Sequence, residues 1–340
     1  MGNNIRPRRG GCAAGGGLTI TTEWLDILLE GSAMEVGECD GIASMVDSAL
    51  GRIKWRMRYA SKRRLQIDIL ALCTRLRPVI MVDYGGKMPE LQERLVSVIE
   101  ILRKDFPGFE HLRVMIIEDM LYIIHVREFA EFISSSLKSE LGHIFCDIGQ
   151  DPPKIVLQTE NSSILIQLKS LQNSLAELFA LGEENSFSSP HTEPKLVSTD
   201  APSTSVPIGS QSPQLIDLNS FLQETQVTIP TLNGWLLGYP VIYLFDKNQI
   251  ADATYNLSTK FLHVYKVLVS RIRQSPNHNE AQQEELLSFT VPYDLSTRGS
   301  NEPWAKEFLA HMEAKLARFR GAWKSLHMEV SEFNPQAIVF

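Results

Sequence analysis

The sequence has 340 residues, of which 44% are hydrophobic and 21% are charged, and this composition excludes a chain that is disordered throughout. Its formal net charge of -7 argues against a protein that grips nucleic acid along its whole length. The apolar runs are interrupted by Lys, Asp or His within about ten residues, well short of the ~20 needed to cross a bilayer, so we expect no membrane association.

The cysteines and the N-terminal residues bear on the cellular compartment. The four cysteines stand far apart with no C-x-x-C pair, which argues against a thiolate zinc site and fits a reducing compartment. The first residues lack the apolar stretch of a secretory signal. We therefore expect a cytoplasmic or nuclear protein whose residues 1–39 form a poorly ordered segment.

Helix and strand patterns alternate in the first half of the chain. Apolar residues recur at helical spacing over 40–57 and again over 65–76, where Pro78 stops the second helix. The short apolar run 79–82 predicts a central strand that is covered on both sides. A turn then leads into a helix over 89–102.

Shorter elements follow. Two apolar runs meet at Glu118-Asp119, which predicts a hairpin turn between two strands. The remaining elements predicted before residue 183 are a helix over 129–137, strands over 143–146 and 155–157, and a helix over 165–182.

Residues 183–214 are rich in Ser, Thr and Pro and have almost nothing to bury, which predicts a disordered insert. Beyond it the chain is more strand-like, with Asn233-Gly234 as a turn signal. A strand over 261–269 is expected to pair antiparallel with residues 286–291. The last helix starts near Pro303 with an apolar stripe that reaches Leu326, and residues 338–340 suggest a final short strand.

These elements predict an α/β fold, with α+β as the alternative. We expect a mixed, partly antiparallel sheet that is flanked by helices. Residues 40–182 and 215–340 would together form one domain, which the disordered insert interrupts.

Acidic residues end several of the predicted strands. Asp83, Asp147 and Asp246 each follow an apolar run, and ligands in α/β proteins gather at the carboxyl ends of strands. If these carboxylates converged, they would form an oxygen-rich site for Mg²⁺ or Mn²⁺, with Asp83 and Asp147 as the catalytic pair. The competing interpretation is that each aspartate only starts a turn or caps a helix.

Two further segments are candidates for binding negatively charged groups. Gly85, Gly86 and Lys87 follow the first strand and could cradle an anion with bare backbone N–H groups, although glycines there also simply make the turn. The basic run from Arg52 to Arg64 is interleaved with Trp55 and Tyr59, as in nucleic-acid contacts. The alternative, which the helical stripe favours, is that these cations form the solvated face of the first helix.

Nucleophilic catalysis has one weak candidate, Cys146 with His143 three residues before it. A buried, inert cysteine is the commoner outcome at the end of an apolar strand.

Two phrases of the sequence resemble a known family. Residues 77–86 (RPVIMVDYGG) and residues 233–243 (NGWLLGYPVIY) are similar to an uncharacterised eukaryotic family, found in animals and plants, that consists of one domain of unknown function. The resemblance implies a domain that covers most of residues 40–340, and it implies no activity and no catalytic residues.

The leading hypothesis is therefore a non-enzymatic interaction or adaptor protein, because no catalytic pattern stands out against its structural alternative. Its protein partners are unknown, and nucleic-acid binding stays open through Arg52 to Arg64. The alternative is a divalent-metal-dependent hydrolase that acts on a phosphate-containing substrate. No cofactor is evident, and Mg²⁺ or Mn²⁺ is expected only under that alternative.

Overall fold

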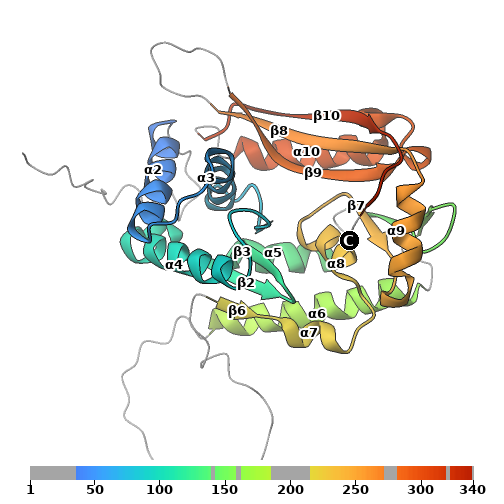
Figure 1. Ribbon diagram of the computed structural model, residues 1–340, viewed down its shortest axis with the longest axis horizontal. Helices are drawn as coiled ribbons and strands as arrows, with labels where there is room; N and C mark the ends of the chain where they lie inside the picture. The colour runs from blue at the N-terminus through green and yellow to red at the C-terminus, as the bar shows by residue number, and fades with distance from the viewer. Residues whose placement is uncertain are drawn as a thin grey trace, which may run out of the picture.

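The computed structural model describes residues 36–138, 142–157, 162–184, 215–271, 282–318 and 322–338. Within these ranges helices surround three β-sheets (Figure 1). The predicted α/β class with mixed strand pairing is confirmed, but the strands are divided among three sheets. Most of the predicted segments 1–39 and 183–214 lies outside the described residues, although a helix already begins at Val36.

The first sheet has the strand order β1-β3-β2-β6, and it is antiparallel except for the parallel pair β2 and β6. Its strands are β1 (Val79–Met81), β2 (Leu112–Ile117), β3 (Met120–His125) and β6 (Leu215–Asp217). The predicted hairpin turn at Glu118-Asp119 joins β2 to β3. The prediction of a central strand over 79–82 was wrong, because β1 lies at the edge of this sheet.

Helices cover both faces of the first sheet. On one face lie α2 (Val36–Arg52), α3 (Tyr59–Cys73) and α4 (Glu90–Asp105), and on the other lie α5 (Val126–Leu137) and α6 (Ser163–Glu184) (Figure 1). Alternate residues of β2 therefore enter different hydrophobic clusters, Val114 and Ile116 on one side and Met115 and Ile117 on the other. This double burial explains why β2 is apolar from Val114 to Ile117.

The other two sheets have three strands each. The second has the order β5-β4-β7, with β4 and β7 parallel, and the third is the antiparallel sheet β10-β8-β9. The predicted pairing of residues 261–269 with 286–291 is confirmed as β8 with β9. The bounds are β4 (Ile144–Asp147), β5 (Lys154–Val156), β7 (Val241–Leu244), β8 (Leu262–Arg271), β9 (Gln282–Pro292) and β10 (Ser325–Phe333).

Four more helices complete the described part of the chain. They are α7 (Asn219–Gln223), α8 (Ile229–Leu236), α9 (Ile250–Ser258) and α10 (Pro303–Ala317). The longest of them, α10, packs along the third sheet near the top of Figure 1. In the described ranges, none of the helices combines the length and apolarity that a bilayer span requires.

The first helix is shorter than its apolar pattern predicts. It ends at Arg52, and Lys54 follows in the left-handed backbone conformation with φ of 55°. Trp55 then folds back onto the same core, where it is buried and its indole N–H donates to the carbonyl of Gly85. The helical period therefore continues past the end of the helix because both segments contact one cluster.

Two other predictions near the C-terminal half need correction. Asn233 and Gly234 form no turn but lie inside α8, which Thr228 caps and which has Pro230 in its first turn. A Cβ atom at position 234 would lie 3.3 Å from the Cα atom of Ile242, so glycine is needed there for close packing.

The end of the chain also differs from the prediction. The last helix ends at Ala317, and Leu326 belongs to strand β10. The final strand therefore comes earlier than predicted. Ile338 lies outside any strand, and residues 339–340 fall outside the described residues.

Candidate functional site

The three predicted metal-binding aspartates do not all meet. Asp83 is exposed and lies just after β1 of the first sheet, whereas Asp147 is the last residue of β4 and Asp246 lies just after β7 in the second. β4 and β7 are parallel neighbours, and Asp147 pairs with Leu244. Asp147 and Asp246 therefore lie at the same edge of the sheet, where these two strands have their carboxyl ends. Across the described ranges, no group of three or more His, Cys, Asp or Glu side chains is arranged to hold a metal ion.

Both acids at this edge already bind backbone groups. The carboxylate of Asp147 accepts hydrogen bonds from the backbone N–H of Gly149 and from the side chain of Gln150. Asp246 accepts from the N–H groups of Asn248 and Gln249 at 2.8 and 3.0 Å, and the Gln249 side chain accepts in return from the N–H of Asp246. This reciprocal pair is a capping box. Metal binding by these residues stays a prediction.

A substitution at Asp246 separates the two roles. We expect Asp246→Ala to lower the free energy of unfolding by about 1 kcal/mol, because the capping bonds are lost. If capping is the whole role of Asp246, the loss is the same with and without 5 mM Mg²⁺ in urea denaturation. A stabilisation by Mg²⁺ that disappears in the variant would support the metal site.

The glycine turn after β1 has a packing role. Gly85 has φ of +93°, and a Cβ atom there would lie 2.8 Å from the terminal methyl of Met57 and 3.1 Å from the ring of Trp55. Glycine is therefore required at this position by the packing of the segment that follows α2. Gly86 and Lys87 lead into α4, and anion binding by Gly85, Gly86 and Lys87 stays a prediction.

The basic run proves to be largely paired. Arg63 is buried and forms an ion pair with Glu284 at 2.6 Å, and Arg64 forms one with Asp68 at 3.0 Å. The interpretation of the run as one solvated face of the first helix was wrong, because α2 ends at Arg52, Arg63 and Arg64 lie on α3, and Arg63 is buried. Trp55 is also buried, so its ring is not available for stacking on a base.

The cysteine candidate lacks the chemistry of a nucleophile. Cys146 is 1% exposed, and burial, with a smaller effect of Asp147, raises the pKa of its thiol to about 12. Its side chain belongs to one hydrophobic cluster, whereas the neighbouring Phe145 belongs to the other. His143 instead lies beside Phe145, and it lines a pocket that none of the sequence patterns indicated.

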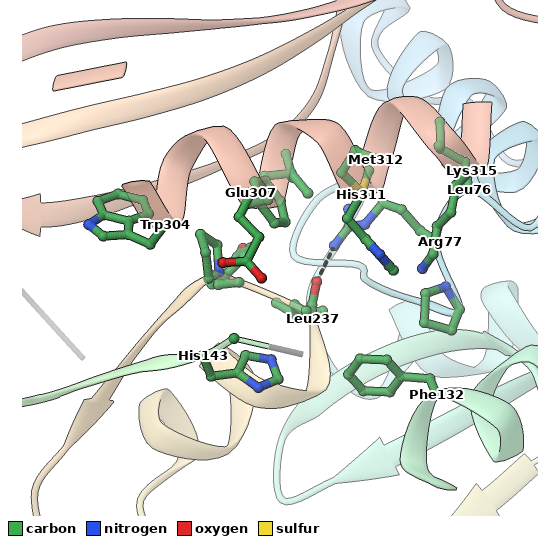
Figure 2. A pocket seen from close by; sticks show the side chains of 17 residues that line it. Leu76, Arg77, Phe132, His143, Leu237, Trp304, Glu307, His311, Met312 and Lys315 are labelled. Atoms are coloured by element: carbon green, nitrogen blue, oxygen red, sulfur yellow. Dashed lines mark hydrogen bonds between the residues drawn. The ribbon is translucent and has the colours of Figure 1, made fainter. Parts of the chain in front are cut away.

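This pocket, hereafter the α10 pocket, lies below α10 and has a volume of about 110 Å³. Figure 2 shows α10 above it, with His143 and Phe132 on the opposite side. The rest of the wall comes from the segments 76–78 and 237–240. Leu287 of β9 completes the wall, so six separate stretches of the sequence meet here, which is typical of a ligand-binding site.

Two parallel stripes of α10 line the pocket. Trp304, Phe308 and Met312 recur every four residues and form the apolar stripe, whereas Glu307, His311 and Lys315 recur at the same spacing beside it. In Figure 2 the side chains of His311 and Lys315 lie at the same end of the pocket as Arg77, and Glu307 lies on the side of Trp304. The α10 pocket thus has a cationic end and a carboxylate end.

Arg77 is the most deeply buried charge in the wall, with 4% of its surface exposed. Its guanidinium donates to the carbonyls of Leu286 and Leu237 at 3.1 and 3.5 Å, and its Nε–H has no hydrogen-bond partner in the described part of the chain. Leu286 is the extra residue of a bulge between β8 and β9, and its carbonyl accepts hydrogen bonds from both Arg77 and Arg64. Within the described ranges, no carboxylate forms an ion pair with Arg77.

Asp68 attracts Arg77 without forming an ion pair with it, and three further basic side chains line the pocket. Burial lowers the pKa of Lys315. The attraction of Glu128 opposes this decrease, whereas the repulsion of Arg318 and Arg77 adds to it. Burial lowers the pKa of His311 as well, followed by the charges of Lys315 and Arg318. Burial alone lowers the pKa of His143 to about 4, so this imidazole is neutral at pH 7.

Chemically, this end of the pocket is suited to a negatively charged group. Buried cations without ion pairs are costly, and an anion placed among them would recover part of that cost. The sequence predicted the apolar stripe of α10 but not the polar stripe beside it, although Glu307, His311 and Lys315 recur every four residues in the sequence. Such spacing of charges is usually a solvated surface, so it carried no signal by itself.

Comparisons with known proteins agree with the resemblance of the two sequence phrases. No curated protein and no solved structure matches the chain. One family model does match, over residues 47–340, which is most of the chain. The chain therefore belongs to the family described as domain of unknown function (DUF4504).

Proposed function

We propose that this protein is a non-enzymatic binding protein, and that its α10 pocket holds the negatively charged group of a ligand with a small apolar body. The observation that carries the proposal is the guanidinium of Arg77, which is buried in the pocket wall without an ion pair among the described residues. Lys315 extends the same positive end toward solvent. Partner proteins and a cytoplasmic or nuclear location belong to the same proposal.

The apolar body follows from the rest of the wall. Trp304 and Met312 are buried beside Phe132 and Leu237, and these side chains offer no charge to a ligand. A cavity of about 150 Å³ is large enough for benzene. The 110 Å³ of the α10 pocket therefore suits an aliphatic group of about the size of a leucine side chain.

The proposal predicts that charge decides binding. We expect 4-methylpentanoate to raise the melting temperature of the full chain, and the isosteric 4-methylpentanamide to leave it unchanged, because only the carboxylate compensates Arg77 and Lys315. Lys315→Gln should weaken carboxylate binding roughly tenfold, or about 1.4 kcal/mol. Thermal shift and isothermal titration calorimetry measure both effects.

Lys306 provides a matched control on the same helix. It is exposed and does not line the pocket, so Lys306→Gln changes the net charge by the same amount and should leave binding as in the wild type. Equal binding of the acid and the amide, or equal losses in the two lysine variants, would contradict the proposal.

The metal-dependent hydrolase remains the second candidate function. The shared sheet edge of Asp147 and Asp246 favours it. The Mg²⁺ measurement with Asp246→Ala tests this alternative independently of the α10 pocket.

A further inference from the structure

The polar stripe of α10 carries opposite charges at its two ends. Glu307 and Lys315 are eight residues apart, so their Cα atoms are separated by about 12 Å along the helix axis. Figure 2 shows Glu307 at the Trp304 end of the pocket and Lys315 at the Arg77 end. The pocket therefore has a carboxylate that can bind a cationic group at one end and cations that can bind an anionic group at the other. The apolar stripe of α10 lies alongside both.

Glu307 is not neutralised by its neighbours. Its side chain is exposed at the rim of the pocket, and no ion pair of Glu307 is present within the described part of the chain. Its carboxylate instead extends away from α10, because its two oxygens lie 3.2 and 3.3 Å from the position that a Cβ atom on Gly142 would occupy. Glycine at position 142 thus leaves room for the carboxylate on the far wall of the pocket.

From this arrangement we propose that the ligand of the α10 pocket is dipolar, with a carboxylate beside Arg77 and Lys315 and an ammonium group beside Glu307. The inference rests on the proposed function, since it places the same anion at the same cationic end. It adds the second charge and the distance between the two. An extended peptide advances about 3.3–3.6 Å per residue, so three residues with free ends match the spacing of the two poles.

A short peptide also suits the middle of the pocket. The central side chain of a tripeptide would enter the apolar part that Trp304, Met312 and Leu237 line. Its size is limited by the volume of about 110 Å³ to an aliphatic group such as that of leucine. The ligand therefore needs two opposite charges about three extended residues apart, with an aliphatic group between them. A long amino acid such as 8-aminooctanoate has the two charges but no peptide groups.

The test uses calorimetry on the full chain with three forms of the tripeptide Ala-Leu-Ala: free at both ends, acetylated at the amino end, and amidated at the carboxyl end. We expect the free form to bind most tightly. Acetylation should weaken binding about three- to fivefold, as for a charge pair at an exposed rim, and amidation roughly tenfold. 8-Aminooctanoate serves as the arm that has both charges but no peptide groups. If 8-aminooctanoate binds, the two charges suffice for recognition. If only the tripeptide binds, the pocket recognises the peptide groups as well. Both results support the proposal.

Variants assign each end of the ligand. Glu307→Gln should weaken the free tripeptide about three- to fivefold and leave the acetylated form unchanged, whereas Lys315→Gln should weaken both of these and leave the amidated form unchanged. Glu313→Gln is the matched control, because Glu313 is exposed on α10 and does not line the pocket. If Lys315→Gln acts as expected while acetylation and Glu307→Gln have no effect, the dipolar ligand is refuted and the anion site stands. If amidation and Lys315→Gln have no effect, both are refuted.

Discussion

Asp68→Ala is expected to lower the free energy of unfolding by about 3–5 kcal/mol, because it removes the negative charge from a buried network. Asp68 lies on α3 with no exposed surface, and its Oδ2 accepts hydrogen bonds from Arg64 at 3.0 Å and from the hydroxyl of Tyr84 at 2.6 Å. Burial raises the pKa of Asp68, and the attraction of Arg64, the hydrogen bond from Tyr84 and the charge of Arg77 oppose that rise. Without this carboxylate, two arginines would remain in the interior with less compensating charge.

Urea denaturation at pH 7 measures this loss of stability, and two further variants provide reference values for its size. Tyr84→Phe removes one hydrogen bond to a charged acceptor and should cost about 1.5–3 kcal/mol. Arg94→Ala breaks an exposed pair with Glu90 on α4 and should cost no more than about 0.5 kcal/mol. A loss in Asp68→Ala as small as that in Arg94→Ala would mean that the network does not stabilise the fold.

This network marks the limit of what the sequence could predict about charge. The partner of Arg63 stands 221 residues further along the chain, and Arg64 donates to backbone carbonyls of Glu285 and Leu286 at a similar separation. A local run of cations therefore gave no indication that two of its members contact β9, with Arg63 buried there and Arg64 half-buried. Local pattern describes which residues are charged, but tertiary contacts decide which charges are solvated.

Elements were predicted well where hydrophobic period and turn chemistry agreed. The hairpin at Glu118-Asp119 and the helices α4 and α5 are examples, because each joins a clear period to a clear boundary. Asn233-Gly234 shows the opposite case. There the two-residue turn signal did not decide the structure. The cap at Thr228 starts a helix, and Gly234 packs closely on Ile242 within it.

The α10 pocket could not be predicted for a different reason. Its wall combines Arg77, His143 and the helix face of Lys315, which come from three separate regions of the chain. Arg77 opens the phrase 77–86 and His143 was considered only beside Cys146, so neither pattern indicated a pocket. Asp147 and Asp246, which end strands, serve a turn and a cap. A site assembled only by tertiary packing leaves no periodic trace in the sequence.

His125 gives the protein a strong dependence on pH. It caps α5, where its Nδ1 accepts from the N–H of Glu128 at 3.3 Å, and it is 5% exposed. Burial lowers its pKa to about 3, and the charges of His111, Arg75 and Arg127 add to the effect. The folded protein therefore keeps this imidazole neutral at pH values where the unfolded chain protonates it.

The sign of the pH dependence follows from this difference. The stabilisation by neutral His125 is fully present above pH 6.5, and it is lost progressively as the pH falls from 6.5 toward 3, because the unfolded chain then binds the extra proton. Between pH 7 and 5.5 we expect the free energy of unfolding to fall on the order of 1 kcal/mol through this residue. Urea denaturation at several pH values in this interval measures the slope before most carboxylates titrate.

His125→Asn isolates the effect, because asparagine keeps an acceptor for the cap of α5 but cannot titrate. The variant should therefore show a shallower slope between pH 7 and 5.5 than the wild type. A remaining slope of similar size is expected from His143, whose pKa burial lowers to about 4, with further contributions from His111 and His311. His327→Asn is the matched control, since His327 lies on the edge strand β10 with more than a third of its side chain exposed. Parallel slopes for His125→Asn and the wild type would show that proton uptake elsewhere causes the loss of stability, and that the buried cap at the start of α5 takes no part in it.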